Sequence, residues 1–394
     1  MVQLPLAHAQ TPTPSTEPLT SATDRRRYER DLTAAISRIT NAGPPAVIVR
    51  VQRDGWLFER ALGVADRRTN RAVRLNTPWR IASVTKLVTA HVIVDLARLG
   101  FLSLDDRLRT FMPRAPRQLG AIPIRALLGH TSGLAEYLPS PLFGATATDL
   151  MRTLSKPSDD VTEAAINRAL QTAAGPAPRV LHQYANTNYV LLEKVAEAAT
   201  GLSFEKLVAE LVSKPAGLSP MARVVGPRAR PRSNLGAAAA RAPSPSERLM
   251  RGYVRADLPH RPYRDTEHLH DVSGHGYFAG GDGGLIANAR DISKAIDFIW
   301  QANTSDGRPL AALTQRMTFD REGLYRYGYG VMEYALPCGV KIYGHEGFDF
   351  GVVTFAFADR ANTRQLVLAV NLSLDENRAL DDAIHALRET VFCR

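Results

Sequence analysis

Residues 83–99 read SVTKLVTAHVIVDLARL, a helical pattern that is apolar on almost every side. A helix without a polar face has no side to present to water, so this segment is predicted to be a buried helix. Its first four residues, Ser83 to Lys86, place a hydroxyl and an amine three positions apart, on one helical face. A lysine among such apolar neighbours needs a reason to be there. The segment therefore combines a buried helix with a candidate chemical site at its start.

Ser83 and Lys86 are the candidate nucleophile and base. At a helix N-terminus the free backbone N–H groups and the positive end of the dipole favour an anion developing near Ser83. A desolvated lysine has a lowered pKa and can accept the proton of the hydroxyl. The alternative interpretation is a helix-capping serine beside an ordinary lysine, because Ser-x-x-Lys alone is common.

A second candidate is Tyr184-Ala185-Asn186, within LHQYANTNYVLL (residues 181–192). We expect it on a tight loop before a helix that begins near Asn188. The phenol of Tyr184 can relay protons to a leaving group, and the amide of Asn186 can hold the substrate or Lys86. The alternative is a loop tyrosine whose ring is simply packed.

A third candidate is His345-Glu346-Gly347, at the end of an apolar strand. Gly347 allows a substrate backbone to approach an edge strand, and the imidazole of His345 can assist proton transfer or orient Tyr184. The backbone amides of Ser83 and Phe348 are then predicted to form an oxyanion hole.

Strand patterns lie towards both ends of the chain. A helix is expected over residues 24–39, followed by a strand hairpin over residues 45–67. Further expected elements are strands at 340–347, 352–360 and 365–371, a final helix at 375–392, and intervening helices near 122–129, 160–173, 189–200 and 203–213. Strands at both ends with helices between them predict an α+β fold, in which both termini build an antiparallel sheet flanked by helices.

The same patterns give the expected organisation of the chain. Residues 1–23 are expected to be a signal remnant and flexible leader, because Ala7-His8-Ala9 has the form of a signal-peptidase site. Residues 24–95 and 276–394 are expected to form the sheet domain, and residues 96–275 an inserted, mostly helical domain. The stretch 222–249, rich in Pro, Arg and Ala, is expected to be a surface loop.

Charge and cysteine content narrow the function classes. The net charge is +10, but the arginines are scattered and no nucleic-acid module accompanies them, so we expect no nucleic-acid partner. No run of eighteen apolar residues occurs, so no membrane span is expected. The two cysteines, Cys338 and Cys393, suggest one disulfide in an exported protein or two unrelated thiols in a cytosolic one.

The three motifs occur in the order Ser-x-x-Lys, Tyr-x-Asn and His-x-Gly. This constellation resembles the serine β-lactamase-like superfamily, and specifically the secreted D-alanyl-D-alanine carboxypeptidases and class C β-lactamases. The resemblance covers roughly residues 25 to 394. Further stretches that fit the same family are PIRALLGHTSGL (123–134), YANTNYVLLEKVAEAATG (184–201), PAGLSPM (215–221) and GGDGGLIANARDI (280–292).

The resemblance implies roles for individual residues. Ser83 would be acylated, Lys86 and Tyr184 would share acid–base duties, and Asn186 would position. His345 stands where most β-lactamases have a lysine, as is typical of the carboxypeptidase branch. Cys338 and Cys393 look like the disulfide of that branch, which favours a secreted or extracytoplasmic location. Phe143 and Phe278 stand where the branch places pocket-lining aromatics, and each could instead be a core residue.

Three positions depart from the carboxypeptidase pattern. Glu346 and Phe348 replace the usual hydroxyl residues, and Met332 stands where an arginine would grip a substrate carboxylate. We expect Glu346 to repel a C-terminal carboxylate. The resemblance thus implies a D,D-carboxypeptidase-like enzyme, D-amino-acid peptidase or amidase, with an esterase or transacylase as the alternative, followed by a β-lactamase and a non-catalytic penicillin-binding sensor.

The predicted enzyme needs no cofactor, and its substrate is a small molecule or peptide with an amide or ester bond. We expect it to be a monomer. A metal hydrolase is the competing interpretation, because ligand-type side chains cluster within residues 267–275. No second cluster with ligand spacing accompanies them, so no catalytic metal is expected. The clustered residues are Glu267, His268, His270, Asp271 and His275.

Overall fold

The central element of the fold is a nine-stranded antiparallel sheet in the order β3-β2-β1-β14-β13-β12-β11-β10-β9. The computed structural model describes residues 19, 21–138, 167, 182–223, 248–255, 269–273, 280–305, 307–308, 310–320, 322–373 and 377–394. The strands are β1 (Ala46–Arg53), β2 (Trp56–Asp66), β3 (Arg71–Ala72), β9 (Thr318–Phe319), β10 (Arg326–Tyr327), β11 (Met332–Ala335), β12 (Lys341–Asp349), β13 (Val352–Asp359) and β14 (Arg364–Val370).

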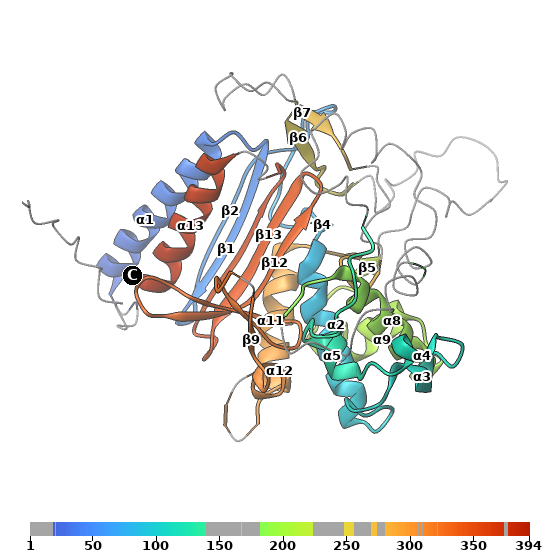
Figure 1. Cartoon of the computed structure of the whole chain (residues 1–394). Coiled ribbons are helices and arrows are strands. Elements are labelled where there is room, and N and C mark those ends of the chain that lie inside the picture. The colour runs from blue at the N-terminus through green and yellow to red at the C-terminus, as the bar shows by residue number, and fades with distance from the viewer. Residues whose placement is uncertain are drawn as a thin grey trace, which may run out of the picture.

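Both ends of the chain meet in the middle of this sheet. β1 pairs with β14 from Val47↔Val370 to Arg53↔Arg364. Both strands are rich in apolar residues and mostly buried, because helices cover both faces of the sheet at this point (Figure 1). The predicted α+β fold, with an antiparallel sheet built from both termini, is therefore confirmed.

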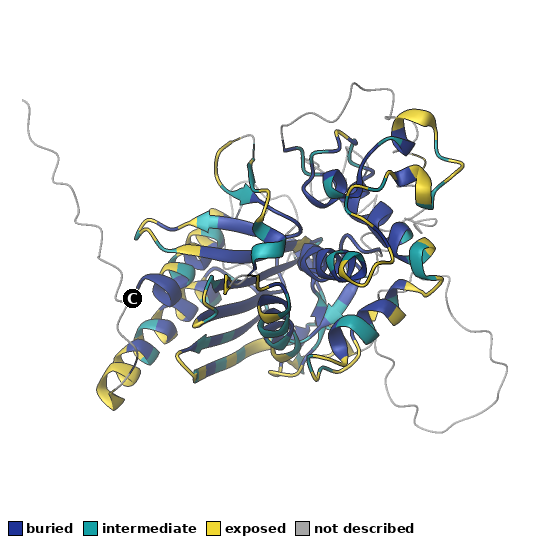
Figure 2. Cartoon of the chain, turned by 90° about the horizontal axis from the view of Figure 1, so that it is seen from below, coloured by how far each residue is buried: buried dark blue, intermediate teal, exposed yellow. Residues whose placement is uncertain are grey.

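Two helices, α1 (Ala22–Asn41) and α13 (Arg378–Cys393), cover one face of the sheet. They lie side by side, and both bury one apolar stripe and expose the other side to water, as Figure 2 shows for the pair beside the C-terminus. Leu32 and Ile36 of α1 and Ile384 and Leu387 of α13 join this layer's core.

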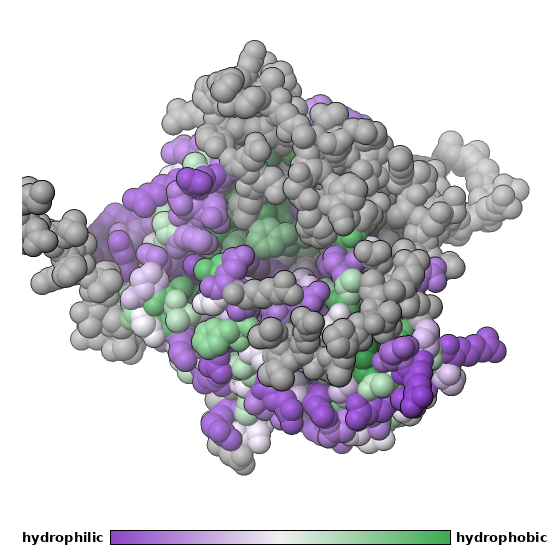
Figure 3. Space-filling model, in the orientation of Figure 1, coloured by the Kyte–Doolittle hydropathy of each residue, from purple (hydrophilic) through white to green (hydrophobic). Residues whose placement is uncertain are grey.

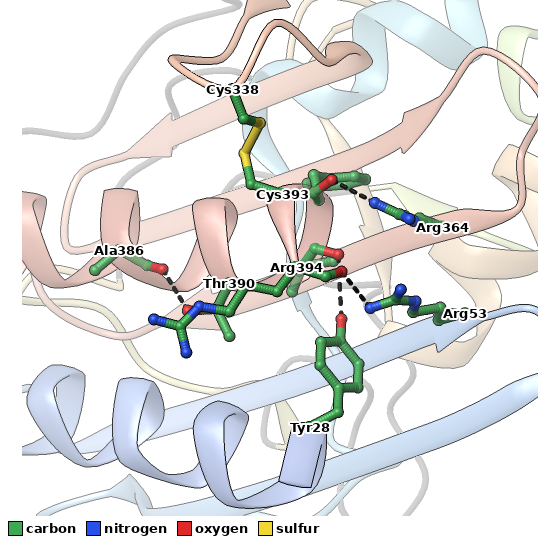
Figure 4. Close-up of a disulfide and its surroundings, with 10 residues drawn as sticks. Tyr28, Arg53, Cys338, Arg364, Ala386, Thr390, Cys393 and Arg394 are labelled. Carbon is green, nitrogen blue, oxygen red and sulfur yellow. Dashed lines mark hydrogen bonds between the residues drawn. A yellow bond between two sulfur atoms is a disulfide. The ribbon is translucent and has the colours of Figure 1, made fainter. Parts of the chain in front are cut away.

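A disulfide and three polar side chains hold the end of α13. Cys338 is joined to Cys393 (Figure 4). The guanidinium groups of Arg53 and Arg364 donate to the carbonyls of Arg394 and Phe392, and the Tyr28 hydroxyl donates to Val391 at 3.1 Å. The carbonyls of the last turn, which have no partner within a helix, are thus satisfied from the sheet and from α1.

The opposite face of the sheet is covered by α11 (Ala289–Ala302) and α2 (Thr85–Arg98). Eleven of the fourteen residues of α2 are buried, which confirms the buried helix predicted from its apolar sequence. One turn of 3₁₀-helix, η1 (Ala82–Val84), precedes α2, so Ser83 lies in that turn rather than in the helix itself.

Smaller elements complete the described part of the chain. The other helices are α3 (Leu108–Phe111), α4 (Arg117–Gly120), α5 (Ile124–Leu128), α8 (Asn186–Thr200), α9 (Phe204–Val208), continued by a π-turn at Ala209–Ser213, and α12 (Ala311–Thr314). β4 (Trp79–Arg80), β8 (Leu285–Ala287) and β5 (Ala222–Arg223) form a small sheet, and β6 (Tyr253–Arg255) pairs with β7 (Leu269–Asp271). The helices predicted near 122–129, 189–200 and 203–213 are present.

Other predictions fall partly outside the described residues. Most of the helix expected at 160–173 and of the loop expected at 222–249 lies there, as does nearly all of the expected leader. Within the described residues no helix is long and apolar enough to cross a membrane. The predicted boundaries of the two domains remain predictions.

Candidate active site

Ser83 lies in a turn that is pressed against the sheet. Ala82, immediately before it, has a φ of 50°, a left-handed conformation that is unfavourable for a residue with a side chain. Such strain persists only where the surroundings enforce it. Here the Ile81 N–H donates to Leu285 at 3.0 Å, and a Cβ on Gly347 would come within 2.4 Å of the Ile81 carbonyl oxygen. The turn that carries the hydroxyl is therefore fixed from two sides.

Lys86 is fully buried, and its amine is surrounded by three acceptors. Nζ lies 2.9 Å from Ser83 Oγ, 2.6 Å from Asn186 Oδ1 and 2.6 Å from the carbonyl oxygen of Asp282. An ammonium group has three protons, so each proton has one acceptor. The contact with Ser83 follows from the spacing of three residues across the start of α2.

The protonated and neutral forms of the Lys86 amine are close in free energy near neutral pH. Burial lowers its pKa to about 8, and the carboxylates of Asp282 and Glu136 partly oppose this shift. The neutral amine, which has a lone pair for the hydroxyl proton of Ser83, is thus accessible near neutral pH.

Tyr184 reaches the same hydroxyl. Its phenol is hydrogen-bonded to Ser83, and Lys86 Nζ lies 5.0 Å from the centre of its ring. Burial holds the pKa of Tyr184 well above its usual value, so the phenol keeps its proton at neutral pH. The hydroxyl of Ser83 is therefore contacted by one candidate base and one candidate acid.

His345 lies at the site but does not bond to Tyr184. Its Nδ1 contacts the carbonyl of Glu346, and its Nε2 lies 2.9 Å from the hydroxyl of Tyr327. The contact with a carbonyl requires a proton on Nδ1, so Nε2 accepts from Tyr327. Burial lowers the pKa of His345 to about 3, and the imidazole is neutral. The rings of His345 and Tyr184 are 6.3 Å apart, so any orientation of Tyr184 by His345 runs through packing and Tyr327.

Gly347 and Phe348 follow on the same strand, where one side of β12 has no strand partner among the described residues. β11 pairs with β12 only as far as Met332↔Gly344, so residues 345–349 extend beyond β11 while still pairing with β13. Gly347 touches η1, and the side chain of Phe348 is 44% exposed. The oxyanion hole expected from the backbone N–H groups of Ser83 and Phe348 remains a prediction.

The expectation that Glu346 repels a substrate carboxylate is wrong. Successive residues of a strand face opposite sides of a sheet, so Glu346 faces away from Ser83. Its cross-strand partner Phe355 belongs to the core under α1 and α13, and its carboxylate is hydrogen-bonded to Tyr334 and lies near Arg388 of α13. Burial raises the pKa of Glu346 to about 7.

Two acidic residues near Lys86 were missed by the sequence analysis. Glu136 accepts hydrogen bonds from the backbone N–H of Asn186 at 2.8 Å and from its Nδ2 at 3.0 Å, which turns Oδ1 of that amide towards Lys86. Asp282 is fully buried, and its Oδ2 accepts from Tyr137 at 2.9 Å. Burial raises the pKa of both carboxyls. Oδ1 of Asp282 has no hydrogen-bond partner among the described residues.

His130 is a further missed residue, in a second left-handed conformation with a φ of 54°. Its ring stacks on Tyr184 with centres 4.3 Å apart. Its Nδ1 accepts from the Ala185 N–H at 3.2 Å and lies 3.0 Å from Asn188 Nδ2. Burial lowers its pKa well below the usual value, so it is a neutral acceptor that holds the Tyr184 loop in place. The HTSGL stretch at residues 130–134 was the sequence feature that could have indicated His130.

Glu193 of α8 holds the glycine-rich loop that faces Lys86. Its Oε2 accepts from the Gly281 N–H at 2.6 Å, one residue before the Asp282 carbonyl that contacts Lys86. The side chain is fully buried. A Cβ on Gly281 would lie 3.2 Å from Glu193 Cβ, so helix and loop are in close contact.

The remaining predicted residues lie elsewhere or outside the described part of the chain. Phe143 and Phe278 are outside it, as are Glu267, His268 and His275 of the ligand-type cluster. His270 and Asp271 lie in β7, where Asp271 forms an ion pair with Arg251. Met332 is buried in β11. Among the described residues no group of three ligand-type side chains could hold a metal ion.

Comparison with known proteins shows the family to which this chain belongs. The Beta-lactamase family model matches residues 26–390, nearly the whole chain. The chain belongs to the Beta-lactamase family. The contacts of Lys86 and Tyr184 with the Ser83 hydroxyl are thus part of a Beta-lactamase family member.

Three curated relatives of this family member carry different functional names. Penicillin-binding protein 4* of Bacillus subtilis is 26% identical over 74% of this chain and 60% of its own length. Esterase EstB of Burkholderia gladioli is 32% identical over 44% and 45%, and a D-aminopeptidase of Cereibacter sphaeroides is 25% identical over 79% and 55%. The matched parts therefore cover less than two thirds of each relative.

A solved structure supports the fold. The D-stereospecific amidohydrolase from Streptomyces sp. superposes with a TM-score of 0.69 at 23% identity, over 92% of this chain and 98% of the other. At this identity the likeness concerns the fold of the Beta-lactamase family member and not its substrate.

Proposed function

We propose that this protein is a serine hydrolase that acts through an acyl-enzyme on Ser83. The observation that carries the proposal is the double contact of the Ser83 hydroxyl, with Lys86 Nζ at 2.9 Å and with the phenol of Tyr184. A nucleophile is activated when a base lies within hydrogen-bond reach and a third group orients that base. Asn186 Oδ1, at 2.6 Å from Lys86, supplies the third group.

The proposed reaction has two halves. Neutral Lys86 takes the proton of Ser83 as its oxygen bonds to the substrate carbonyl, and the oxyanion forms near the backbone N–H groups of Ser83 and Phe348. Tyr184 gives its proton to the leaving amine or alcohol, the carbon–leaving-group bond breaks, and Lys86 returns a proton to the phenol. Water then attacks the ester on Ser83 in the same way, which releases the acid and restores the hydroxyl.

We propose an amide or short peptide of a D-amino acid, with a cationic end, as the substrate. Two buried carboxyl groups, Glu136 and Asp282, lie within electrostatic reach of Lys86. Carboxylates attract an ammonium group and repel a C-terminal carboxylate. Met332, at the position of the expected carboxylate-binding arginine, points the same way, and one relative is named D-aminopeptidase.

The first test is release of amine from D- and L-amino-acid amides, free or acetylated at the amino group, by the wild type and by Ser83→Ala. We expect turnover of the free D-amides only, and none by the variant. Mass spectrometry after brief exposure to benzylpenicillin tests the nucleophile separately. An adduct on Ser83 without amide turnover would retain the acyl-enzyme and reject the substrate class, whereas turnover by Ser83→Ala would reject the whole proposal.

Esterase activity is the second candidate, because the relative with the highest identity reported above is named an esterase. The same acyl-enzyme serves an ester, and an alcohol is an easier leaving group than an amine. Hydrolysis of p-nitrophenyl butyrate with a kcat/KM above that of every D-amide would place this function first.

We further propose that the protein works in an oxidising, extracytoplasmic compartment. The Cys338–Cys393 disulfide supports this location, because such bonds persist mainly outside the reducing cytosol. Fractionation of the native cell, with alkylation of free thiols before lysis, tests it. Free thiols on both cysteines in the cytosolic fraction would contradict it.

A further inference from the structure

A cavity of about 510 Å³ lies beside α5. Its walls come from α5 and the turn after it, from β9 and the residues before it, and from Tyr329. None of Ser83, Lys86, Tyr184, Asn186 and His345 lines it. The volume falls within the range of cavities that hold small organic ligands. This cavity is therefore a candidate site that the proposed reaction does not use.

The cavity has an apolar wall and a cationic rim. Ala126, Met317 and the buried ring of Tyr329 form the apolar part. Arg107, Arg125 and Arg316 supply the guanidinium groups. In Figure 3, hydrophilic residues dominate the lower part of the visible face, where Figure 1 places α5 and its neighbouring helices.

The positive charge at the rim is only partly neutralised. Arg125 forms an ion pair with Asp105. Within the described chain, Arg107 and Arg316 have no carboxylate partner, and Arg107 donates to the Ala121 carbonyl at 2.7 Å. Arg316 and Arg125 both act on the phenol of Tyr329, where they oppose the rise in its pKa caused by burial. Arg107 and Arg316 thus line the cavity without a carboxylate partner in the described part of the chain.

Backbone hydrogen bonds fix part of the wall of the cavity, including the Cα atom of Arg107. Arg107 pairs with Pro123 in an isolated antiparallel bridge, and the Tyr329 N–H donates to Leu313 at 2.8 Å. Gly129 and Thr131 line the cavity on either side of His130, whose ring stacks on Tyr184. An occupant would touch the segment that holds the Tyr184 loop.

We propose that this cavity binds a small organic anion, whose apolar body packs on Ala126, Met317 and Tyr329 while its carboxylate or sulfonate meets Arg107 and Arg316. Guanidinium groups suit such anions because their planar forks donate paired hydrogen bonds to two oxygens. The proposal stands independently of the function proposed for Ser83.

The test uses the full chain and two fluorescent probes of similar shape. 8-Anilinonaphthalene-1-sulfonate carries the sulfonate, and N-phenyl-1-naphthylamine lacks it. We expect the sulfonate to bind at one site and the neutral probe to bind more weakly. Arg107→Gln and Arg316→Gln should each weaken sulfonate binding about fivefold, since both side chains are exposed, and the double variant more than tenfold.

Arg114→Gln is the matched control, an exposed arginine between α3 and α4 that does not line the cavity. It should bind the sulfonate like the wild type, and thermal melts should show that all variants fold alike. Raising the salt concentration should weaken binding to the wild type and not to the double variant. Equal affinity for both probes, or equal affinity of the double variant and Arg114→Gln for the sulfonate, would overturn the proposal.

Discussion

The amine of Lys86 decides at the scale of a single residue whether Ser83 can be activated. Its pKa of about 8 means that the protonated form dominates below pH 8 and the neutral form above it. Only the neutral form can take the hydroxyl proton, so the acylation rate should rise about tenfold per pH unit up to pH 8 and then level off. Burst kinetics with a p-nitrophenyl ester between pH 6 and pH 10 measure this rate.

Lys86→Arg is the control for this pH profile. Arginine keeps the positive charge throughout the pH range and cannot act as the base, so the burst should disappear at every pH. A wild-type burst that is independent of pH between 6 and 9 would show that Lys86 is not the group that activates Ser83.

The contribution of the Tyr184 hydroxyl can be tested separately from that of its ring. Tyr184→Phe keeps the stacking on His130 and removes only the phenol that contacts Ser83. We expect kcat for an amide to fall by about 10²–10⁴-fold with little change in melting temperature, because the lost group supplies proton transfer rather than packing. Amides and esters assayed in parallel measure this, with Tyr325→Phe as the control at a neighbouring ring. A variant that retains more than a tenth of the activity contradicts the role.

Some site residues were predictable from sequence because their chemistry is local. Ser83 and Lys86 are one helical turn apart, so their contact follows from spacing alone. Glu136 and Asp282 lie near Lys86 but come from segments about 50 and 200 residues away along the chain. The hydrophobic periodicity of a sequence cannot predict a contact between such distant segments. His130 was equally hidden, since its role depends on a left-handed backbone and on a stack with Tyr184 that only the fold creates.

The contact between β12 and η1 decides the site at the scale of elements. Gly347→Ala would place a Cβ 2.4 Å from the Ile81 carbonyl oxygen, so the strand and the Ser83 turn would have to move apart. We expect the burst on Ser83 to fall by more than about 100-fold, because an acyl-transfer site tolerates little misplacement. Stability should fall by about 1–3 kcal/mol, as for overpacking elsewhere.

Phe348→Ala is the matched change one residue further along β12. It removes an exposed side chain and leaves the backbone N–H in place, so acylation should change little. Equal loss of acylation in the two variants would indicate that the strand edge is disturbed by any substitution, and would contradict a specific role for Gly347.

Strand direction also explains why one expectation about this element failed. Glu346 stands between His345 and Gly347 in sequence, and proximity in sequence suggested proximity to the substrate. The alternation of a strand sends it to the other face, where Tyr334 and Arg388 surround it. The position of β12 was readable from its apolar run, whereas the face of each side chain required the register with β13.

At the scale of the whole molecule, the disulfide secures the outer layer of the fold. The Cys338–Cys393 bond closes a loop with a sequence separation of 55 residues. Its removal in a Cys338→Ser, Cys393→Ser double variant should lower the free energy of unfolding by about 4 kcal/mol. Denaturant titrations of the wild type with and without reductant measure this, and the double variant should not respond to reductant.

Acylation of Ser83 at low temperature should survive the same change, because α13 lies on the opposite face of the sheet from α2. Loss of acylation in a folded double variant would show that the two layers are coupled. An overall architecture of this kind was predictable, because apolar runs at both ends of the chain have few ways to share one sheet.

The pairing of β1 with β14 also constrains how the chain is made. β1 (residues 46–53) can pair with β14 only after residues 364–370 have been synthesised. At about 5–20 residues per second, the synthesis of the chain between them takes tens of seconds. Throughout that time an apolar strand has no partner on one side, a state that invites aggregation and chaperone binding. The centre of the sheet therefore cannot form until residues 364–370 have been synthesised, long after β1 itself.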